Sequence, residues 1–363
     1  MPIHYAVGQA LVSDEELREK QHKQNFDFTQ AAQFESGNFV PEATGEPLPF
    51  EPIGVGKPLI VEIREIYTGK FPGRRSKDLL VTSAMKSIAA FNGAPRAINY
   101  MHKDVQRYQS MDVVPAVENG TPLIFYSPAL TQKNSTITIE FGFDEFNEQA
   151  FETVGGLFQD AAGVPLFAPA SNILLAASGI TRIIGRIGEL LGEKRQVFRS
   201  SEPLNLLRAG DVVAKAGFAL LTDERNPMSK DDRSKYQIDK FGKLVDSTGT
   251  AYAGDTPYAI ISYDGREMRE YEDFSPTQAS AEILDRFYSI GRNSDEGAKI
   301  IFDSLKLLSD QRFRSEADDL AKEISELDPT ADAEKIARLT MEREALIKNI
   351  TNDLFKPKDG GSA

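Results

Sequence analysis

The sequence predicts an α+β fold: an antiparallel β-sandwich that carries an inserted apolar helix and is followed by a C-terminal helical module. Three observations lead to this prediction. Short runs of β-branched residues, separated by turn signals, recur through residues 58–274, a pattern typical of sandwiches. A stretch without any charged residue runs from Ala161 to Thr181, in a chain that is 27% charged. Beyond residue 275, apolar residues recur at helical spacing.

The composition is that of a globular protein. With 363 residues, 40% of them hydrophobic, the chain is long enough for two domains and a sizeable core. Its net charge of −13 argues against nucleic-acid binding, which needs a basic surface. The chain has no cysteine, which excludes disulfides and thiolate chemistry, and its N-terminus does not read as a signal peptide. These features together predict a cytoplasmic protein.

Residues 1–57 are predicted to form an extended or partly disordered arm. Charged, helix-forming residues lie between Ser13 and Lys23, and a proline-rich segment follows them. Its prolines, Pro41, Pro47, Pro49 and Pro52, prevent regular structure. Order is therefore expected to start at Pro58.

The sandwich is predicted over residues 58–274. Its expected strands are Leu59–Tyr67, Leu79–Ala84, Pro122–Tyr126, Ser135–Phe143, Arg195–Arg199, Phe218–Leu221 and Tyr258–Tyr263. The turn signal Asp264-Gly265 predicts that Glu267–Tyr271 pairs back as a hairpin. Residues 222–254 form a long, charged connection, which is expected to be functional or mobile.

An apolar helix is predicted inside an insertion spanning residues 150–192. Pro165 and Pro169 interrupt the uncharged stretch, so the helix is expected to start near Ser171. Its apolar stripe consists of Ile173, Ala177, Ile180, Ile184, Ile187 and Leu191. This stripe fits a helix packed on the sandwich with its apolar side inward. It also fits a concealed segment that enters a membrane after a release step.

Residues 275–356 are predicted to form a helical hairpin or bundle, and residues 357–363 a flexible tail. A capping box with proline at the first helical position starts the first helix at Ser275. A second helix carries Ile300, Ile301, Leu305, Leu307 and Leu308. A third helix, beyond Pro329, carries Ile336, Leu339, Leu346, Ile347, Ile350 and Leu354 on one face.

No catalytic pattern stands out, so the sequence predicts no enzyme, metal site or cofactor. Of the three histidines, His4 and His22 lie in the predicted arm, and His102 is expected at the surface. The glycines at 54 and 56 are followed by Lys57-Pro58 and do not form a phosphate-binding loop. A hydrolase that uses carboxylates, or a metal held by them, is kept as a third alternative.

The loop after the first long strand is a candidate binding site. Between Gly69 and Lys77 it carries Lys70, Arg74, Arg75 and Lys77, in an otherwise acidic protein. Phe71 is expected to be exposed on the same turn, as a shallow apolar anchor. The charges predict contact with phospholipid headgroups or with the acidic face of a protein partner, and the alternative is an ordinary solvated loop.

Residues 58–145 resemble C2-type β-sandwich domains. The strand at Leu59–Tyr67, the long loop and the strand from Asp78 to Ser83 are similar to the first strand, calcium loop and second strand of that family. The resemblance implies binding of phospholipid or a protein partner at the loop end. The family's calcium-binding aspartates are missing here except for Asp78, so calcium is not the ligand that the resemblance implies.

The sequence thus predicts a non-catalytic protein that binds another macromolecule, with a protein partner or an anionic surface contacted through loop 69–77. The alternative is a latent membrane-active effector. In that case, proteolysis or partner binding would release the apolar segment 154–191, and the charged region 222–254 would be the expected cleavage site. Changing Ile180 or Ile184 to aspartate would then abolish leakage of vesicles, and would also destabilise the fold if the helix is part of the core, because an unpaired buried carboxylate is costly. Neither hypothesis predicts an oligomeric state.

Overall fold

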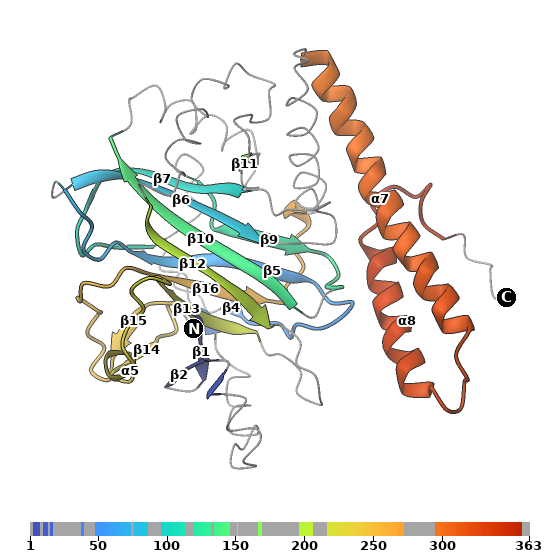
Figure 1. Cartoon of the computed structure of the whole chain (residues 1–363), viewed down its shortest axis with the longest axis horizontal. Helices are drawn as coiled ribbons and strands as arrows, with labels where there is room; N and C mark the ends of the chain where they lie inside the picture. Colours follow the sequence, from blue (N-terminus) through green and yellow to red (C-terminus); the bar gives the residue numbers. More distant parts are fainter. Residues whose placement is uncertain are drawn as a thin grey trace.

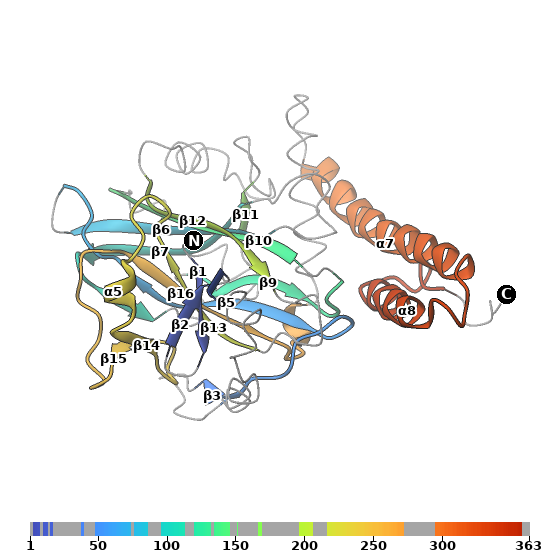
Figure 2. The same ribbon diagram turned by 60° about the horizontal axis from the view of Figure 1, so that its bottom comes forward.

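Two antiparallel β-sheets stacked face to face form the body of the protein (Figures 1 and 2). The computed structural model describes residues 3–7, 10–13, 15–16, 38–39, 48–73, 76–85, 96–112, 120–131, 134–145, 151, 166–168, 196–205, 216–271 and 295–357. Within these ranges, the antiparallel, β-rich architecture followed by C-terminal helices confirms the predicted fold class in outline.

The first sheet has seven strands in the order β2-β1-β13-β16-β5-β8, and β9 also pairs with β5. Their bounds are Ile3–Val7 (β1), Ala10–Ser13 (β2), Leu59–Tyr67 (β5), Ser110–Asp112 (β8), Leu123–Ser127 (β9), Gly217–Thr222 (β13) and Tyr258–Asp264 (β16). Three of the seven strands pair with β5, so this strand is the hub of the sheet.

The second sheet has five strands in the order β11-β7-β6-β10-β12. Their bounds are Ser76–Met85 (β6), Arg96–Gln106 (β7), Asn134–Asp144 (β10), Leu166–Ala168 (β11) and Gln196–Asn205 (β12). Two small ribbons, β3 (Asn38–Phe39) with β4 (Leu48–Pro49) and β14 (Tyr236–Ile238) with β15 (Leu244–Asp246), complete the strands.

Alternating side chains explain why the two sheets stack. On β10, Ile137, Ile139 and Phe141 are all completely buried and belong to the apolar core, while Thr136 and Thr138 alternate with them on the other face. The ring of Phe141 stacks on Phe198 of β12, with centroids 4.2 Å apart. This period-two pattern is the signal that predicted the strand from the sequence.

A second apolar cluster covers the outer face of the seven-stranded sheet. It joins side chains of β5, β13 and β16 to the region 222–254, through Tyr67, Phe218, Leu220, Met228, Leu244, Tyr252, Tyr258 and Ile260. Buried Glu65 accepts hydrogen bonds from the Tyr258 hydroxyl (2.9 Å) and the Leu244 backbone N–H (3.2 Å). Region 222–254, expected to be a long exposed connection, is therefore a folded element that carries α5 (Lys230–Arg233), β14 and β15.

Two further expectations are wrong. Order does not begin at Pro58, because β1 pairs with β13 and with β2 inside the seven-stranded sheet. The segment Glu267–Tyr271 does not form a strand. The Met268 backbone N–H donates to the Tyr126 hydroxyl (3.2 Å), and Arg269–Tyr271 form a short 3-10 helix, η3. These contacts turn the chain away from β16.

The first helix of the C-terminal module (275–294) lies outside the described residues, and so does most of the insertion 150–192. The described helices are α7 (Asp295–Ser325) and α8 (Ala333–Lys348), which pack as a hairpin beside the sandwich (Figure 1). Helix α8 ends earlier than expected, and Leu354 is 87% exposed rather than part of its apolar face.

The hairpin has a small apolar core of its own, formed by Phe313, Ala317, Leu346 and Ile350. Buried Asp310 on α7 closes it, because its carboxylate accepts hydrogen bonds from the backbone N–H groups of Thr351 (3.0 Å) and Asn352 (2.8 Å). These bonds hold the chain that follows α8 against α7.

Asn349 joins this hairpin to the sandwich. Its side-chain amide donates to the carbonyl oxygens of Ala129 (2.7 Å) and Ala345 (2.8 Å), and its amide oxygen accepts from the Ser127 hydroxyl (2.9 Å). Asn349 is buried, so its amide nitrogen and oxygen form hydrogen bonds with protein groups instead of with water.

We therefore predict that Asn349→Ala destabilises the protein by about 1–3 kcal/mol, because it leaves buried polar groups without partners. Urea unfolding measures the change, and amide hydrogen exchange across α7 and α8 locates it. Asn352→Ala is the control, since within the described part of the chain the Asn352 side chain makes a single hydrogen bond, which it accepts from the Leu354 N–H (3.0 Å). Equal effects of the two variants would contradict this role of Asn349.

The N-terminal hairpin is fixed to α5 by a buried polar contact. Arg233 donates to Nε2 of His4, and Glu16 accepts from Arg233 (3.3 Å) and pairs with Lys230 (3.3 Å). Burial, together with the Arg233 charge, lowers the pKa of His4 to about 3. His4 is therefore neutral in the folded protein at neutral pH.

We predict that this histidine makes the protein less stable as the pH falls. The pKa of His4 is about 3 when folded, against 6.5 for the unfolded chain, so between these values only the unfolded state gains the proton. The contribution of neutral His4 to the free energy of unfolding is complete well above pH 6.5. As the pH falls from 7 to 5, about 1–2 kcal/mol of this stability is lost.

The measurement is the melting temperature at pH 7 and pH 5 for the wild type and for His4→Gln. The variant is expected to be less stable at pH 7 but to lose less on acidification. An equal loss in both proteins would show that another group causes the pH dependence.

Candidate binding surface at one end of the sandwich

The first residues after β5, Gly69 and Lys70, are held in place by their neighbours. Gly69 has a φ of +55°, and a Cβ there would lie 2.6 Å from the Asp255 carbonyl oxygen, so only glycine fits. The Lys70 N–H donates to that same oxygen (3.0 Å), and the Gly69 carbonyl accepts from the Tyr108 N–H (2.9 Å). The loop is therefore fixed between the 255 segment and the turn that joins β7 to β8.

That turn is fixed in its place by Thr68. The buried Thr68 hydroxyl donates to the Gln106 carbonyl (2.8 Å) and accepts from the Gln109 N–H (3.0 Å). Two residues of this region, Asp104 (φ 54°) and Tyr108 (φ 60°), have left-handed backbone conformations. They are the only non-glycine residues with positive φ in the described ranges. Such conformations are strained for side chains other than glycine and persist only where the surroundings impose them.

Phe71 is not the exposed anchor that the sequence predicted. Only 1% of it is exposed, because its ring stacks on Phe143 with centroids 4.3 Å apart. The Arg107 guanidinium lies over the same ring, 5.6 Å from its centroid, and donates to the Gly73 carbonyl (2.6 Å). Phe71 therefore fixes the loop to the core, which sequence alone could not reveal because Phe143 is distant in the chain.

The exposed aromatic residue of this surface is Tyr108, which is not among the residues predicted for the site. It is 46% exposed, and its hydroxyl donates to Oδ1 of Asp255 (3.0 Å). No pattern in the sequence marks it, because its exposure follows from the left-handed turn. Strand pairing and Thr68 impose that turn.

We call this surface the basic end and define it by Lys70, Lys77, Arg107 and Tyr108. Lys70 lies 3.5 Å from Oδ2 of Asp255, with both side chains largely exposed. Lys77 has no charged partner within the described part of the chain, and the Arg107 Nε is buried without an acceptor there. The other two predicted cations, Arg74 and Arg75, lie outside the described residues. Ammonium, guanidinium and phenol donors of this kind suit carboxylate or phosphate groups.

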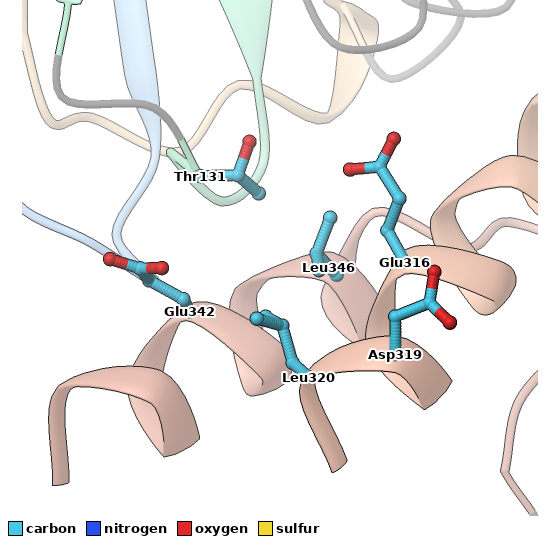
Figure 3. A pocket seen from close by; sticks show the side chains of 6 residues that line it. All are labelled: Thr131, Glu316, Asp319, Leu320, Glu342 and Leu346. Carbon is cyan, nitrogen blue, oxygen red and sulfur yellow. The ribbon is translucent and has the colours of Figure 1, made fainter. Parts of the chain in front are cut away.

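A groove at the hairpin of α7 and α8 is lined by acidic side chains instead of basic ones (Figure 3). Its volume is about 250 Å³, and it lies between the loop after β9 and the facing sides of α7 and α8. Its lining consists of Thr131, Glu316, Asp319, Leu320, Glu342 and Leu346. Glu316 pairs with Arg312 (3.3 Å). No cluster of potential ligands suited to a metal ion occurs among the described residues, here or elsewhere.

The groove and the basic end lie at opposite ends of β5. Residues just before this strand meet the hairpin, where a Cβ on Gly56 would lie 3.9 Å from the Met341 carbonyl oxygen. The basic end follows Tyr67 at the other end. Nine residues of strand span about 30 Å, so the two surfaces are far apart.

The predicted membrane or partner helix, with Ile173, Ala177, Ile180, Ile184, Ile187 and Leu191, lies outside the described residues. Among the helices that are described, none has the length and apolar character needed to cross a membrane.

Comparisons with known proteins do not identify a family. No protein-family model matches the sequence, and a search of curated proteins finds no significant match. The function must therefore be argued from the surfaces themselves.

We predict that Phe71→Ala destabilises the protein by about 3–5 kcal/mol, because it removes a fully buried ring from a packed core. Tyr108→Ala, a change to the neighbouring exposed aromatic, is expected to cost less than about 1 kcal/mol. Chemical denaturation of both variants provides the test. A small loss for Phe71→Ala would mean that the ring is a surface anchor after all.

Proposed function

We propose that this chain is a non-catalytic, macromolecule-binding protein whose basic end contacts an acidic segment of a protein partner. The observation that carries the proposal is Tyr108, an exposed aromatic side chain held in a strained turn beside Lys70 and Arg107. Aromatic and arginine side chains are the residues that contribute most to protein interfaces.

The strain supports a binding role. A non-glycine residue in the left-handed region costs on the order of 1 kcal/mol or more. Two such residues lie close together in the chain, Asp104 near the end of β7 and Tyr108 in the turn that follows. Strained backbone conformations are found preferentially at sites where binding needs a particular geometry. The hydrogen bonds of Thr68 and the stacking of Phe71 on Phe143 stabilise this geometry in the free protein, so the surface is preorganised for binding.

A protein partner fits this surface better than a membrane does. Stable membrane attachment needs an apolar anchor in addition to basic charge, and Phe71 is buried. Each exposed cation adds only about 1 kcal/mol near an anionic bilayer, while the whole chain carries a net charge of −13. A short acidic segment, by contrast, can meet the local cations without approaching the rest of the acidic surface.

The position of the basic end agrees with a C2-like module, which we retain as part of the proposal. The loop joins the first two long strands of the sandwich, β5 and β6, as the resemblance implies. Asp78 accepts a hydrogen bond from the Asp104 N–H (3.1 Å), and it is the one aspartate in a stretch of sequence that also holds Lys70, Arg74, Arg75 and Lys77. We therefore propose no calcium at this loop.

The alternative of a latent membrane-active effector rests on segment 154–191, of which the structure describes only residues 166–168. Its proposed cleavage region, 222–254, is packed against the seven-stranded sheet through Met228, Leu244 and Tyr252. Packing of this kind protects a chain from proteolysis. We therefore do not propose this function.

The test uses a fluorescein-labelled octaglutamate peptide and fluorescence anisotropy at an ionic strength of about 0.15 M. We predict that Lys77→Glu weakens binding by about threefold or more, because it replaces an attraction with a repulsion at the site. Lys57→Glu makes the same change of charge at the opposite end of β5 and is expected to have little effect, since salt screens charges at that distance.

Two results would overturn the proposal. Equal weakening by Lys77→Glu and Lys57→Glu would mean that only net charge matters. Binding to phosphatidylserine vesicles without binding to the peptide would favour a membrane surface. Melting temperatures of all the variants are measured alongside, so that unfolding is not mistaken for lost binding.

A further inference from the structure

Asp255 already places a carboxylate in the basic end. Its Oδ1 accepts a hydrogen bond from the Tyr108 hydroxyl (3.0 Å), and its Oδ2 lies 3.5 Å from Nζ of Lys70. Both oxygens of one carboxylate are thus engaged by donors from two different segments. An acidic side chain of a partner could bind the same two donors, the Tyr108 hydroxyl and the Lys70 ammonium group.

The backbone around Asp255 is fixed, while its side chain is accessible. The Asp255 carbonyl accepts from the Lys70 N–H (3.0 Å), and the neighbouring Gly254 carbonyl accepts from the Tyr67 hydroxyl (3.0 Å). The Asp255 side chain is nevertheless 65% exposed. Rotation about its χ1 can therefore move the carboxylate away from Lys70 and Tyr108 without moving the loop.

We infer that Asp255 is an internal competitor for the acidic partner of the basic end. In the free protein, the Asp255 carboxylate accepts the hydrogen bond of Tyr108 and pairs with Lys70. In the complex, a glutamate or aspartate of the partner takes its place, and Asp255 turns to solvent. This inference rests on the proposed function and adds the chemistry of the contact. The partner presents a carboxylate that two donors share, rather than an apolar or a basic group.

The weakness of the internal contact makes exchange feasible. Ion pairs between largely exposed side chains contribute little to stability, and here both partners are more than half exposed. An internal competitor as weak as Asp255 lowers the affinity of the basic end for its partner only modestly. It also adds selectivity, because only a ligand with a carboxylate can replace the contacts that Lys70 and Tyr108 lose when Asp255 leaves.

The closing experiment compares Asp255→Asn with Asp104→Asn, using the labelled octaglutamate peptide. Asp255→Asn keeps an oxygen for the Tyr108 hydroxyl but removes the charge facing Lys70. Asp104→Asn removes the same charge from the same end, at a position where asparagine suits the positive φ. Within the described part of the chain, Asp104 forms no ion pair with a lysine or arginine.

We expect Asp255→Asn to bind the peptide about two- to fivefold more tightly than the wild type, and Asp104→Asn less than about 1.5-fold more tightly. Adding Lys70→Ala to Asp255→Asn should remove the gain, because the gain comes from freeing Lys70. A corresponding octaglutamine peptide should bind none of these proteins.

The outcomes separate this inference from the proposed function. Equal gains for Asp255→Asn and Asp104→Asn, or weaker binding by Asp255→Asn, would overturn the internal competitor while the wild type still binds the peptide. A gain that survives Lys70→Ala would overturn it as well. If neither the wild type nor Asp255→Asn binds the peptide, the proposed function fails and the competitor fails with it.

Discussion

Face-to-face burial of two apolar sheet faces is the constraint on which the other features of this protein depend. The inward side chains of β5, β6 and β10 exclude water between the sheets, and this fixes the register of every strand around them. The core continues to one end of the sandwich through the stack of Phe71 on Phe143. Phe71 therefore keeps the part of the chain that directly follows β5 at that end of the sandwich.

The basic end is a consequence of this packing. Because Phe71 is held in the core and Thr68 is bonded to the β7–β8 turn, Tyr108 must adopt its left-handed conformation and project outward. The cations beside it are then presented on a rigid surface, which reduces the entropy lost on binding. At the other end of β5, the hairpin of α7 and α8 is docked by Asn349 and bears carboxylates. The groove at that end is lined by Glu316, Asp319 and Glu342, whereas Lys70 and Lys77 lie at the basic end.

Much of the fold follows from local patterns in the sequence, whereas most of the site does not. Strand β10 was predictable because apolar and polar residues alternate along it, and β5 because it is a run rich in β-branched residues, nearly all of which the fold buries. Strand β1 was not, since this five-residue segment is held in the sheet by pairing with β13, far along the chain, as well as with its neighbour β2. Lys70 and Lys77 could be found from local charge. The burial of Phe71 and the exposure of Tyr108 depend on contacts with distant segments.

The most direct test of the account is a map of where an acidic ligand binds. Amide chemical shifts of the ¹⁵N-labelled protein would be recorded by NMR during titration with the octaglutamate peptide. We predict that the changes gather at residues 68–73, at Lys77, at the Arg107–Gln109 turn and at Asp255. Shifts that are scattered over the surface, or that gather at the hairpin instead, would contradict the assignment of the basic end as the binding surface.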